Sequence, residues 1–455
     1  MKVVVVGGGK IGATIIESLA KESHDVLCID SNPEVVAEIG NIYDVMTICG
    51  NGSAYDILKE AGVENAELFI AVTGSDELNM LSCFAARKMG AKQTVARIRD
   101  LEYNTESLGF LKSSLQLSMA INPEKLTAEA LFNLLKLPSA LKVETFTSRK
   151  FQMVELIVKA NSPLDGISLI DLRKKYNEKF LVCVLSRGNE VYIPSGNTKL
   201  LEGDKICVIA ASEDTHKLLK SLGYLQKEAK ETIILGGSKT AHYLTEMLLK
   251  DRSSVKIIEK DKQRCEDLCE HLPSGVDVIC GNGMSQDVLM EEGIETTDAL
   301  VALTGSDEEN ILISFYAMSK NVSKVISKVN RNELSGLAEK LGLDCIVSPK
   351  HIIADILVRY ARALHETIGS KVESLYSLMG GNAEALEFTV TQDFEFSGVA
   401  LKNLQLKPDI LIAGIIRGLN SFIPGGDDYI TSGDKVIVIA KGKSLCSLAE
   451  IAEGR

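Results

Sequence analysis

The chain repeats itself once along its whole length, and this duplication constrains its fold more than any other feature. The opening VVVVGGGKIGATIIESLA matches TIILGGSKTAHYLTEMLL, with Gly7 opposite Gly236. ICGNGSAYDIL then matches ICGNGMSQDVL, and AVTGSDELNML matches ALTGSDEENIL. Towards the end of each copy, LEGDKICVIAAS resembles TSGDKVIVIAKG. Self-similarity at one nearly constant offset predicts a duplicated unit of about 225 residues.

The first part of each copy has the pattern of a parallel α/β sheet. In the first copy, β-branched runs alternate with helical patterns that begin with Ile11–Lys21 and continue from about Pro33. The runs expected to be strands are Lys2–Val6, Val26–Ile29, Val45–Ile48, Leu68–Val72 and Thr94–Ile98. Short apolar runs separated by amphipathic helices indicate buried parallel strands in βαβ units.

The second part of each copy reads as a small α+β module. A helix with Pro123 in its first turn leads out of the Rossmann-like part, and Pro138-Ser139 marks a break. After it we expect strands at Gln152–Val158, Leu181–Ser186, Glu190–Ile193 and Ile206–Ala210, with a helix at Ser168–Lys175. The expected fold class is therefore α/β, a tandem duplication of a Rossmann-like parallel-sheet domain followed by a small α+β domain.

These patterns set the expected domain boundaries. The Rossmann lobes are expected at 1–122 and 230–348, each followed by a linking helix at 123–138 or 349–368. The small α+β lobes are then expected at 139–226 and 369–455.

Charge and hydropathy exclude several classes of partner. The net charge of −12 would repel a nucleic-acid backbone, so we expect no nucleic-acid partner. No apolar run approaches the roughly 18–20 residues of a membrane span. The apolar run before the first three glycines is only Val3 to Val6, and a run of this length is too short for the apolar region of a signal peptide. We therefore expect a soluble, cytoplasmic protein.

The first glycine string has the spacing of a dinucleotide-binding turn. Gly7-x-Gly9-x-x-Gly12 follows an expected strand and opens an expected helix, a context that permits a tight turn and close approach of the backbone to a pyrophosphate. The phosphates would then face unpaired N–H groups at the helix N-terminus. Asp30, at the end of the second strand, is placed to bind ribose hydroxyls. The alternative is that the glycines only tighten a turn.

Further loops are expected at the same edge of the sheet. Gly50-Asn51-Gly52 follows the third strand, and Thr73-Gly74-Ser75-Asp76 follows the fourth. Arg97, at the fifth strand, is either a donor to phosphate or, like Arg99, a surface charge. Asp76 and Asn79 have helix capping as their alternative role.

The second copy departs from this pattern. Ser238 replaces Gly9 and Ala241 replaces Gly12, while Glu259 takes the place of Asp30. Because serine is bulkier where a pyrophosphate must approach, binding is expected to be less secure at this site. A P-loop reading of Gly236 to Thr240 is rejected, because Ser238 stands where a Walker motif requires glycine.

The cysteines and histidines show no catalytic or metal pattern. Ten cysteines are scattered through mainly apolar runs, which is typical of a reducing cytosol. Cys265, Cys269 and His271, with Cys280 as a fourth ligand, would be a metal cluster, but no paired C-x-x-C knuckle supports it. The small modules lack an acid–base apparatus, with His216 alone in the first. We therefore expect a ligand-regulated protein and not an enzyme.

The motifs GGGKIG, CGNGS, AVTGSDELNM and ARIRD, in this order and within a tandem repeat, give the chain a family resemblance. It resembles, over essentially its whole length, the TrkA family, the regulatory RCK-domain subunits of Trk-type potassium uptake systems. The resemblance implies binding of NAD(H) and of ATP or ADP. It also implies a homo-oligomeric ring, expected as a tetramer of this tandem chain. The ring would dock on an integral-membrane potassium-translocating subunit of the TrkH/TrkG type, at the inner face of the membrane.

The resemblance carries two sets of nucleotide contacts onto this chain. The first set is Gly7, Gly8, Gly9, Lys10, Ile11, Gly12, Asp30, Asn51, Gly52, Thr73, Gly74 and Arg97. The second set is Gly236, Gly237, Ser238, Lys239, Thr240, Glu259, Asn282, Thr304, Gly305 and Lys328. Two other functions stay open at this point: an NAD-dependent oxidoreductase, and a nucleotide-binding scaffold without a channel partner.

Overall fold

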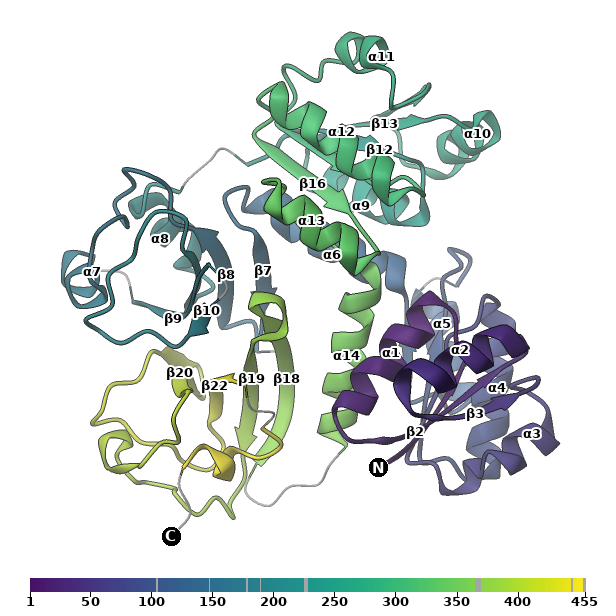
Figure 1. Ribbon diagram of the computed structural model, residues 1–455, viewed down its shortest axis with the longest axis horizontal. Helices are drawn as coiled ribbons and strands as arrows, with labels where there is room; N and C mark the ends of the chain where they lie inside the picture. The colour runs from purple at the N-terminus through teal and green to yellow at the C-terminus, as the bar shows by residue number, and fades with distance from the viewer. Residues whose placement is uncertain are drawn as a thin grey trace. The chain divides into compact units, whose positions relative to one another are not determined.

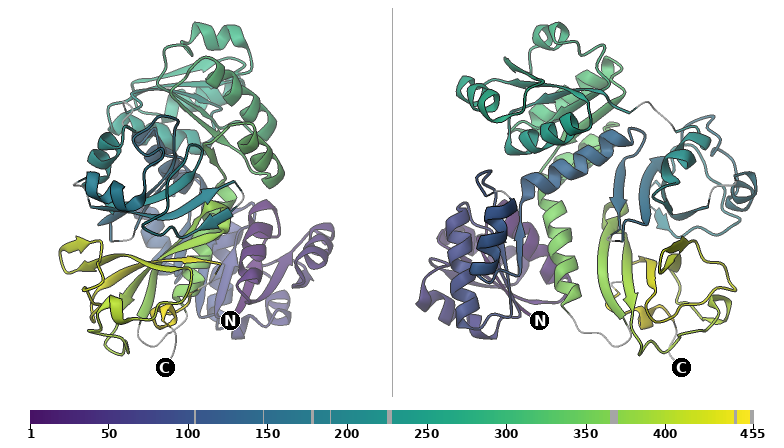
Figure 2. Two further views of the ribbon diagram at one scale, coloured as in Figure 1. Left: turned by 60° about the vertical axis from the view of Figure 1, so that its left-hand side comes forward. Right: turned by 180° about the vertical axis from the view of Figure 1, so that it is seen from behind.

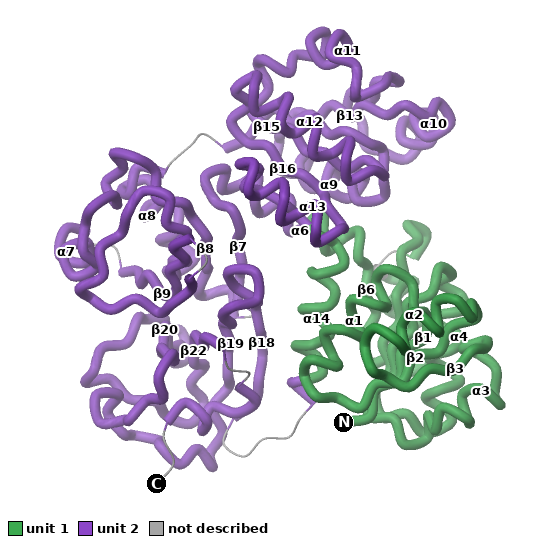
Figure 3. The backbone as a smooth tube through the Cα atoms, in the orientation of Figure 1, with its two compact units in different colours: residues 1–128, 348–361 green, residues 129–347, 362–455 purple. Residues whose placement is uncertain are grey.

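The chain folds into two compact units that do not follow the duplication. The computed structural model describes residues 1–103, 105–146, 148–176, 179–188, 190–224, 228–364, 370–442 and 445–452 (Figures 1 and 2). Residues 1–128 and 348–361 form the first unit, and residues 129–347 and 362–455 form the second (Figure 3).

The first unit contains a six-stranded parallel sheet in the order β3-β2-β1-β4-β5-β6. Its strands are β1 (Lys2–Val6), β2 (Asp25–Asp30), β3 (Met46–Cys49), β4 (Leu68–Ala71), β5 (Gln93–Arg97) and β6 (Met119–Ile121). The connecting helices are α1 (Lys10–Lys21), α2 (Pro33–Tyr43), α3 (Tyr55–Glu60), α4 (Asp76–Met89) and α5 (Thr105–Ser114). The order reverses between β1 and β4, and ligands bind at such a switch point in open α/β sheets.

The second unit repeats this sheet in the order β14-β13-β12-β15-β16-β17. The strands are β12 (Glu231–Leu235), β13 (Ser254–Glu259), β14 (Val276–Cys280), β15 (Ala299–Ala302), β16 (Lys324–Lys328) and β17 (Ile346–Val347). Its helices are α9 (Lys239–Lys250), α10 (Lys262–His271), α11 (Gln286–Glu291), α12 (Asp307–Ser319) and α13 (Asn332–Lys340). The expected tandem Rossmann-like fold is confirmed.

Each copy also has a small antiparallel sheet, and both belong to the second unit. The first consists of β7 (Lys142–Thr145), β8 (Phe151–Ile157), β9 (Phe180–Arg187), β10 (Glu190–Tyr192) and β11 (Lys205–Ala211), with α7 (Leu169–Lys175) and α8 (Thr215–Ser221). The second consists of β18 (Ser370–Leu378), β19 (Ala383–Val390), β20 (Ile410–Arg417), β21 (Asn420–Phe422) and β22 (Lys435–Lys441). Short 3-10 turns, Leu401–Asn403 and Leu448–Ile451, replace its α-helices.

An ion pair between a partly exposed arginine and a buried aspartate braces both small sheets in the same way. The guanidinium of Arg187 donates two hydrogen bonds of 2.7 Å to the carboxylate of Asp204, which is 1% exposed. Arg417 and Asp434 repeat the pair at 2.9 and 2.7 Å. Because a bidentate pair fixes the plane of both groups, each Gly-Asp turn is tied to the neighbouring strand.

The two small sheets share one hydrophobic core. Phe146 of the first and Tyr376 of the second pack edge to face with ring centroids 5.2 Å apart. The hydroxyl of Tyr376 donates to the Thr145 carbonyl oxygen at 2.7 Å. Apolar side chains of both sheets, such as Cys207 and Ile437, are fully buried in this cluster. The duplicated lobes therefore fold against each other.

Each of the two linking helices makes contacts with the other copy of the repeat. Helix α14 (Pro349–Ala363) leads to the second small sheet, but residues 349–361 belong to the first unit, where the Tyr360 hydroxyl donates to Gln93 Oε1 at 3.1 Å. At the end of α6 (Pro123–Lys136), Lys136 Nζ lies 2.6 Å from Asp251, which caps α9 of the second Rossmann sheet. Each helix thus packs partly with the other copy, and the domain boundaries stay a prediction.

Candidate functional site

In the first glycine turn, a side chain at either of two glycines would be strained or would clash with the backbone. Gly7 has a φ of +101°, in the region that favours glycine, and its N–H donates to the Ile29 carbonyl oxygen at 2.8 Å. A Cβ at Gly12 would lie 1.8 Å from the Gly7 carbonyl oxygen. Helix α1 can therefore approach the end of β1 only because position 12 has no side chain.

The start of helix α1 is open to a ligand. Gly9 occupies its N-cap position and provides no side-chain cap, while Lys10 and Ile11 form the first turn. A Cβ at Gly9 would meet no atom within 4 Å. Because the first N–H groups of a helix lack partners within it, this turn can accept an anion at the positive end of the helix dipole.

The acidic residue at the end of β2 holds the glycine turn from the other side. Asp30 Oδ2 accepts a hydrogen bond of 2.6 Å from the Gly8 N–H, and Oδ1 accepts one of 2.8 Å from Asn32. In the second copy, Glu259 accepts from Gly237 and Asp261 at 2.6 and 2.9 Å. Each carboxylate is thus fixed beside its glycine turn, where the sequence predicted it.

The loop after β4 is held by the side chain of Asn79, for which helix capping was one of two alternative roles. Asn79 is fully buried, and its Oδ1 accepts from the N–H and Oγ1 of Thr73 at 2.8 and 2.7 Å. Its amide donates to the Arg97 carbonyl oxygen at 2.9 Å. The capping alternative does not hold for Asn79, because the cap of α4 is Ser75. The Asn79 side chain instead joins the ends of β4 and β5.

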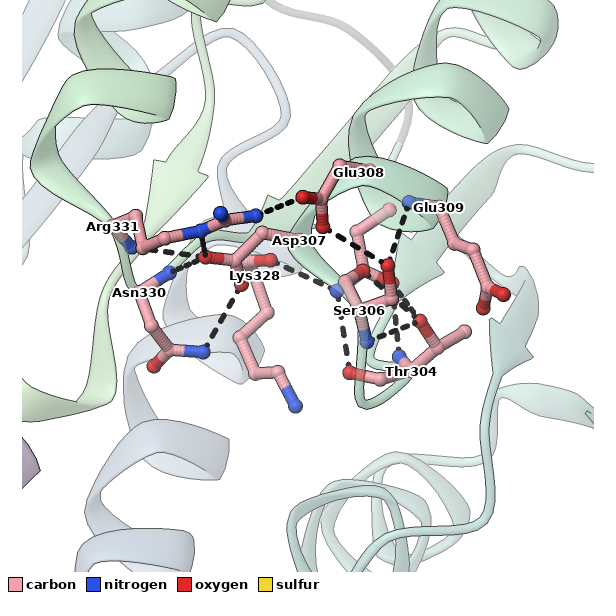
Figure 4. A network of polar contacts seen from close by, with 9 residues as sticks. Thr304, Ser306, Asp307, Glu308, Glu309, Lys328, Asn330 and Arg331 are labelled. Carbon is pink, nitrogen blue, oxygen red and sulfur yellow. Dashed lines mark hydrogen bonds and ion pairs between the residues drawn. The ribbon is translucent and has the colours of Figure 1, made fainter.

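Asp76 also has a role other than capping. Its Oδ2 accepts hydrogen bonds of 2.7 and 2.8 Å from the N–H groups of Arg99 and Asp100. The second copy repeats the arrangement around Asp307, which accepts from the N–H groups of Asn330 and Arg331 at 3.0 and 2.9 Å (Figure 4). These buried carboxylates therefore shape the loops after β5 and β16.

The cation expected to contact phosphate lies at the same edge of the first sheet. Arg97 Nη1 donates to the Thr73 carbonyl oxygen at 3.4 Å, and no described residue accepts from its buried Nε. Burial lowers the pKa of Arg97, and the nearby Arg99 charge lowers it further. An anion bound here would relieve both effects. In the second copy, Lys328 Nζ donates to the Leu303 carbonyl oxygen at 3.3 Å.

The loop after β3 closes the site on a third side. Asn51 Oδ1 accepts from the N–H of Ser53 at 3.0 Å, and Asn282 accepts from Met284 at the same distance. A Cβ at Gly52 would lie 2.1 Å from Val6 Cγ1. The expected loops of the first copy therefore converge on the end of β1, with Gly74 at the tip of the neighbouring loop.

In the second copy these elements enclose a cavity of about 390 Å³. Seven of the predicted residues line it: Gly236, Gly237, Ser238, Glu259, Asn282, Thr304 and Gly305. Lys239, Thr240 and Lys328 are not among the lining residues. Lys260 and Arg264 were missed, and Arg264 Nε donates to the Gly237 carbonyl oxygen at 2.7 Å. The repeat could not have indicated them, because the first copy has Ser31 and Val35 at these positions.

Ser238 changes the start of helix α9 chemically as well as sterically. Its Oγ accepts a hydrogen bond of 3.3 Å from the Ala241 N–H and so caps the helix. The first copy leaves the corresponding N–H groups of α1 without a side-chain cap. The second turn is therefore partly satisfied by its own side chain before any anion arrives.

Among the described residues, no group of three or more His, Cys, Asp and Glu side chains is arranged to hold a metal ion. Nor does any helix in the described ranges have both the length and the apolar character needed to cross a membrane.

Comparisons with known proteins agree with the duplication. A family model described as the TrkA-N domain matches residues 3–118 and 232–349. A second, described as the TrkA-C domain, matches residues 153–223 and 385–452. The chain is 32% identical over 451 residues to the Trk system potassium uptake protein TrkA homolog of Archaeoglobus fulgidus, covering 99% of this chain and 100% of that protein.

Two solved structures of the GsuK protein share the fold. The GsuK RCK domain has a TM-score of 0.63 and 15% identity, covering 97% of this chain and 92% of that one. The GsuK channel bound to NAD also has a TM-score of 0.63 and 15% identity, covering 97% of this chain and 77% of that one.

Proposed function

The chain belongs to the TrkA family of Trk system potassium uptake proteins, and from this premise we propose that it is a nucleotide-binding regulatory subunit. It binds NAD(H) and ATP or ADP and gates an integral-membrane potassium-translocating subunit of the TrkH/TrkG type. It works in the cytoplasm, at the inner face of the membrane where that partner lies.

The cavity of the second Rossmann sheet is the observation that carries this proposal. Its lining combines a glycine turn, a helix start, an acidic residue at the end of β13 and the loops after β14 and β15. These are the groups that hold pyrophosphate and ribose in dinucleotide-binding folds. A volume of about 390 Å³ is within the range of small-molecule sites. The NAD of the GsuK channel, a protein of the same fold, gives independent support.

The lining favours regulation over catalysis. A hydride-transfer enzyme needs a positioned proton donor or acceptor beside its cofactor. The carboxylate of Glu259 is engaged by two backbone N–H groups, and the cavity-lining residues include no histidine or cysteine. We therefore place regulation ahead of catalysis at this site.

Regulation by a nucleotide requires two arrangements of the protein that bind it unequally. We place these arrangements in a homo-oligomeric ring, a tetramer of this tandem chain, in which ATP, ADP and NADH favour different positions of neighbouring Rossmann lobes. Exposed leucines support self-association: Leu81 on α4 is 54% exposed, and Leu312, its counterpart on α12, is 61% exposed. We place the contacts between neighbouring lobes at these two equivalent positions.

Calorimetric titration of the full chain with ATP, ADP, NAD and NADH tests nucleotide binding. We expect two sites per chain, with Asp30→Ala weakening the first and Glu259→Ala the second. Asp393→Ala, at an exposed position, is the matched control and should leave both unchanged. A thermal melt of each variant shows whether the fold is intact. Failure of all four nucleotides to bind the folded wild-type chain would refute the proposal.

A further inference from the structure

Helix α10 meets the edge strand β14 at the backbone of Glu259. The Glu259 carbonyl oxygen accepts a hydrogen bond of 2.9 Å from the Gly281 N–H and one of 3.4 Å from the Cys265 thiol. On β14, Cys280 is the register partner of Glu259. Two cysteines from different elements therefore converge on one residue, and the carboxylate of that residue lines the second cavity.

The two thiols differ in accessibility. Cys265 is 7% exposed, while Cys280 is exposed at the edge of the sheet. Burial is the largest cause that raises the pKa of Cys265 to about 12, and a hydrogen bond with the Cys280 thiol is the next. Cys280 is therefore the thiol that a reagent reaches first, and Cys265 is its buried neighbour.

The first copy provides an internal comparison. Cys49 stands where Cys280 does and is also exposed, with its thiol 3.9 Å from the Ser31 carbonyl oxygen. The position of Cys265 is occupied by Val36. Of the two Rossmann lobes, as far as the structure describes them, the second has this pair of neighbouring thiols and the first does not.

We propose that Cys265 and Cys280 are a redox modification site and form a reversible disulfide by exchange with a low-molecular-weight disulfide such as oxidised glutathione. The Cys280 thiolate attacks one sulfur of the small disulfide and releases one thiolate. Cys265 then attacks the Cys280 sulfur of the mixed disulfide, and its proton passes to the second thiolate that leaves. The chain loses two hydrogens, and one small disulfide becomes two thiols.

The bond would act on the second cavity, a consequence that rests on the proposed nucleotide binding. It links α10 to β14 directly beside Glu259, and the residue before Cys265 is Arg264, whose guanidinium holds the Gly237 carbonyl oxygen at 2.7 Å. Because a covalent link restricts the movement of α10, oxidation changes how the cavity wall adapts to a nucleotide. The site of the first copy, which lacks the pair, keeps its affinity.

Peptide mapping of the full chain tests the bond itself. The protein is equilibrated in glutathione buffers of increasing oxidised fraction, alkylated and digested without reductant. We expect a cross-linked 265–280 peptide, two hydrogens lighter than the sum of its parts, that disappears with dithiothreitol. It should be absent in Cys265→Ser and Cys280→Ser and unchanged in Cys269→Ser, with Cys49 alkylated in every fully reduced control. Two free thiols in every buffer, or a bond to Cys269 instead, would overturn the proposal.

Nucleotide titration before and after oxidation tests the consequence separately. We expect at least a threefold change in dissociation constant at the second site, and no change in Cys280→Ser. Equal affinity in the presence of the mapped bond would overturn the link to the cavity. Absence of nucleotide binding before oxidation would refute the proposed function, while the mapped 265–280 bond would still stand.

Discussion

The substitution Gly9→Ser would give the first site the helix cap that Ser238 provides at the second. Its effects on ligand affinity and on the stability of the fold can then be measured separately. The structure has room for the substitution, because a Cβ at Gly9 meets no atom within 4 Å and the backbone φ is −64°. By analogy with Ser238, the new hydroxyl should accept a hydrogen bond from the Gly12 N–H. That N–H would then no longer be available to donate to a bound phosphate.

The two expected effects have opposite signs. A hydrogen bond to a charged group contributes about 1.5–3 kcal/mol, so its loss should weaken nucleotide binding at the first site roughly 10- to 100-fold. A serine cap in place of glycine should stabilise the fold by only a few tenths of a kcal/mol. The reverse change, Ser238→Gly, should tighten the second site.

Calorimetry gives the affinities, and hydrogen exchange of peptides covering residues 7–12 and 236–241 assigns them to a site. Gly109→Ala is the control, because position 109 lies on helix α5 and also has open space around it. Unchanged affinity in Gly9→Ser, in a protein with wild-type melting temperature, would refute the argument that this turn binds phosphate.

Three further predictions concern the fold and its assembly. Asn79→Ala should lower the free energy of unfolding by about 3 kcal/mol in urea denaturation, because it leaves buried backbone groups without partners; a loss below 1 kcal/mol would contradict this. Burial lowers the pKa of His242 below 6.5 despite Glu246, so the neutral ring stabilises the fold above pH 6.5 and this contribution is lost as the pH falls through the folded-state pKa. The melting temperature of His242→Gln should therefore fall less than that of the wild type between pH 7 and pH 5. Parallel falls in the two proteins would contradict this role of His242. Leu81→Asp combined with Leu312→Asp should reduce the oligomer to smaller species in light scattering, whereas an intact tetramer would place the ring contacts elsewhere.

The sequence was sufficient for five strands of the first Rossmann sheet because their signals are local, but the short sixth strand, Met119–Ile121, was not predicted. Gly7 and Gly12 are dictated by one tight turn, and the buried strands are continuous apolar runs. The same local reading placed Asp30 correctly beside its turn. It also predicted the strands β8, β9 and β11 of the first small sheet to within two residues.

Local sequence patterns could not predict the interactions between distant segments. The role of Asn79 depends on contacts with two strand ends, although its recurrence as Asn310, six residues after the loop threonine, was a usable signal. Helix α14 was placed with the second copy, but its packing on the first depends on tertiary contacts such as Tyr360 with Gln93. The amphipathic pattern of a helix shows that one of its faces is buried, but it does not show which lobe covers that face.

Potassium flux tests the central claim most directly. Vesicles that contain the membrane subunit are combined with the full chain, and potassium uptake is measured with ATP, ADP or NADH at saturating concentration. Regulation by differential binding predicts unequal flux among the three ligands, and a weaker response in Gly9→Ser to any ligand of the first site. Equal flux in all three, with each nucleotide shown to be bound, would contradict the account.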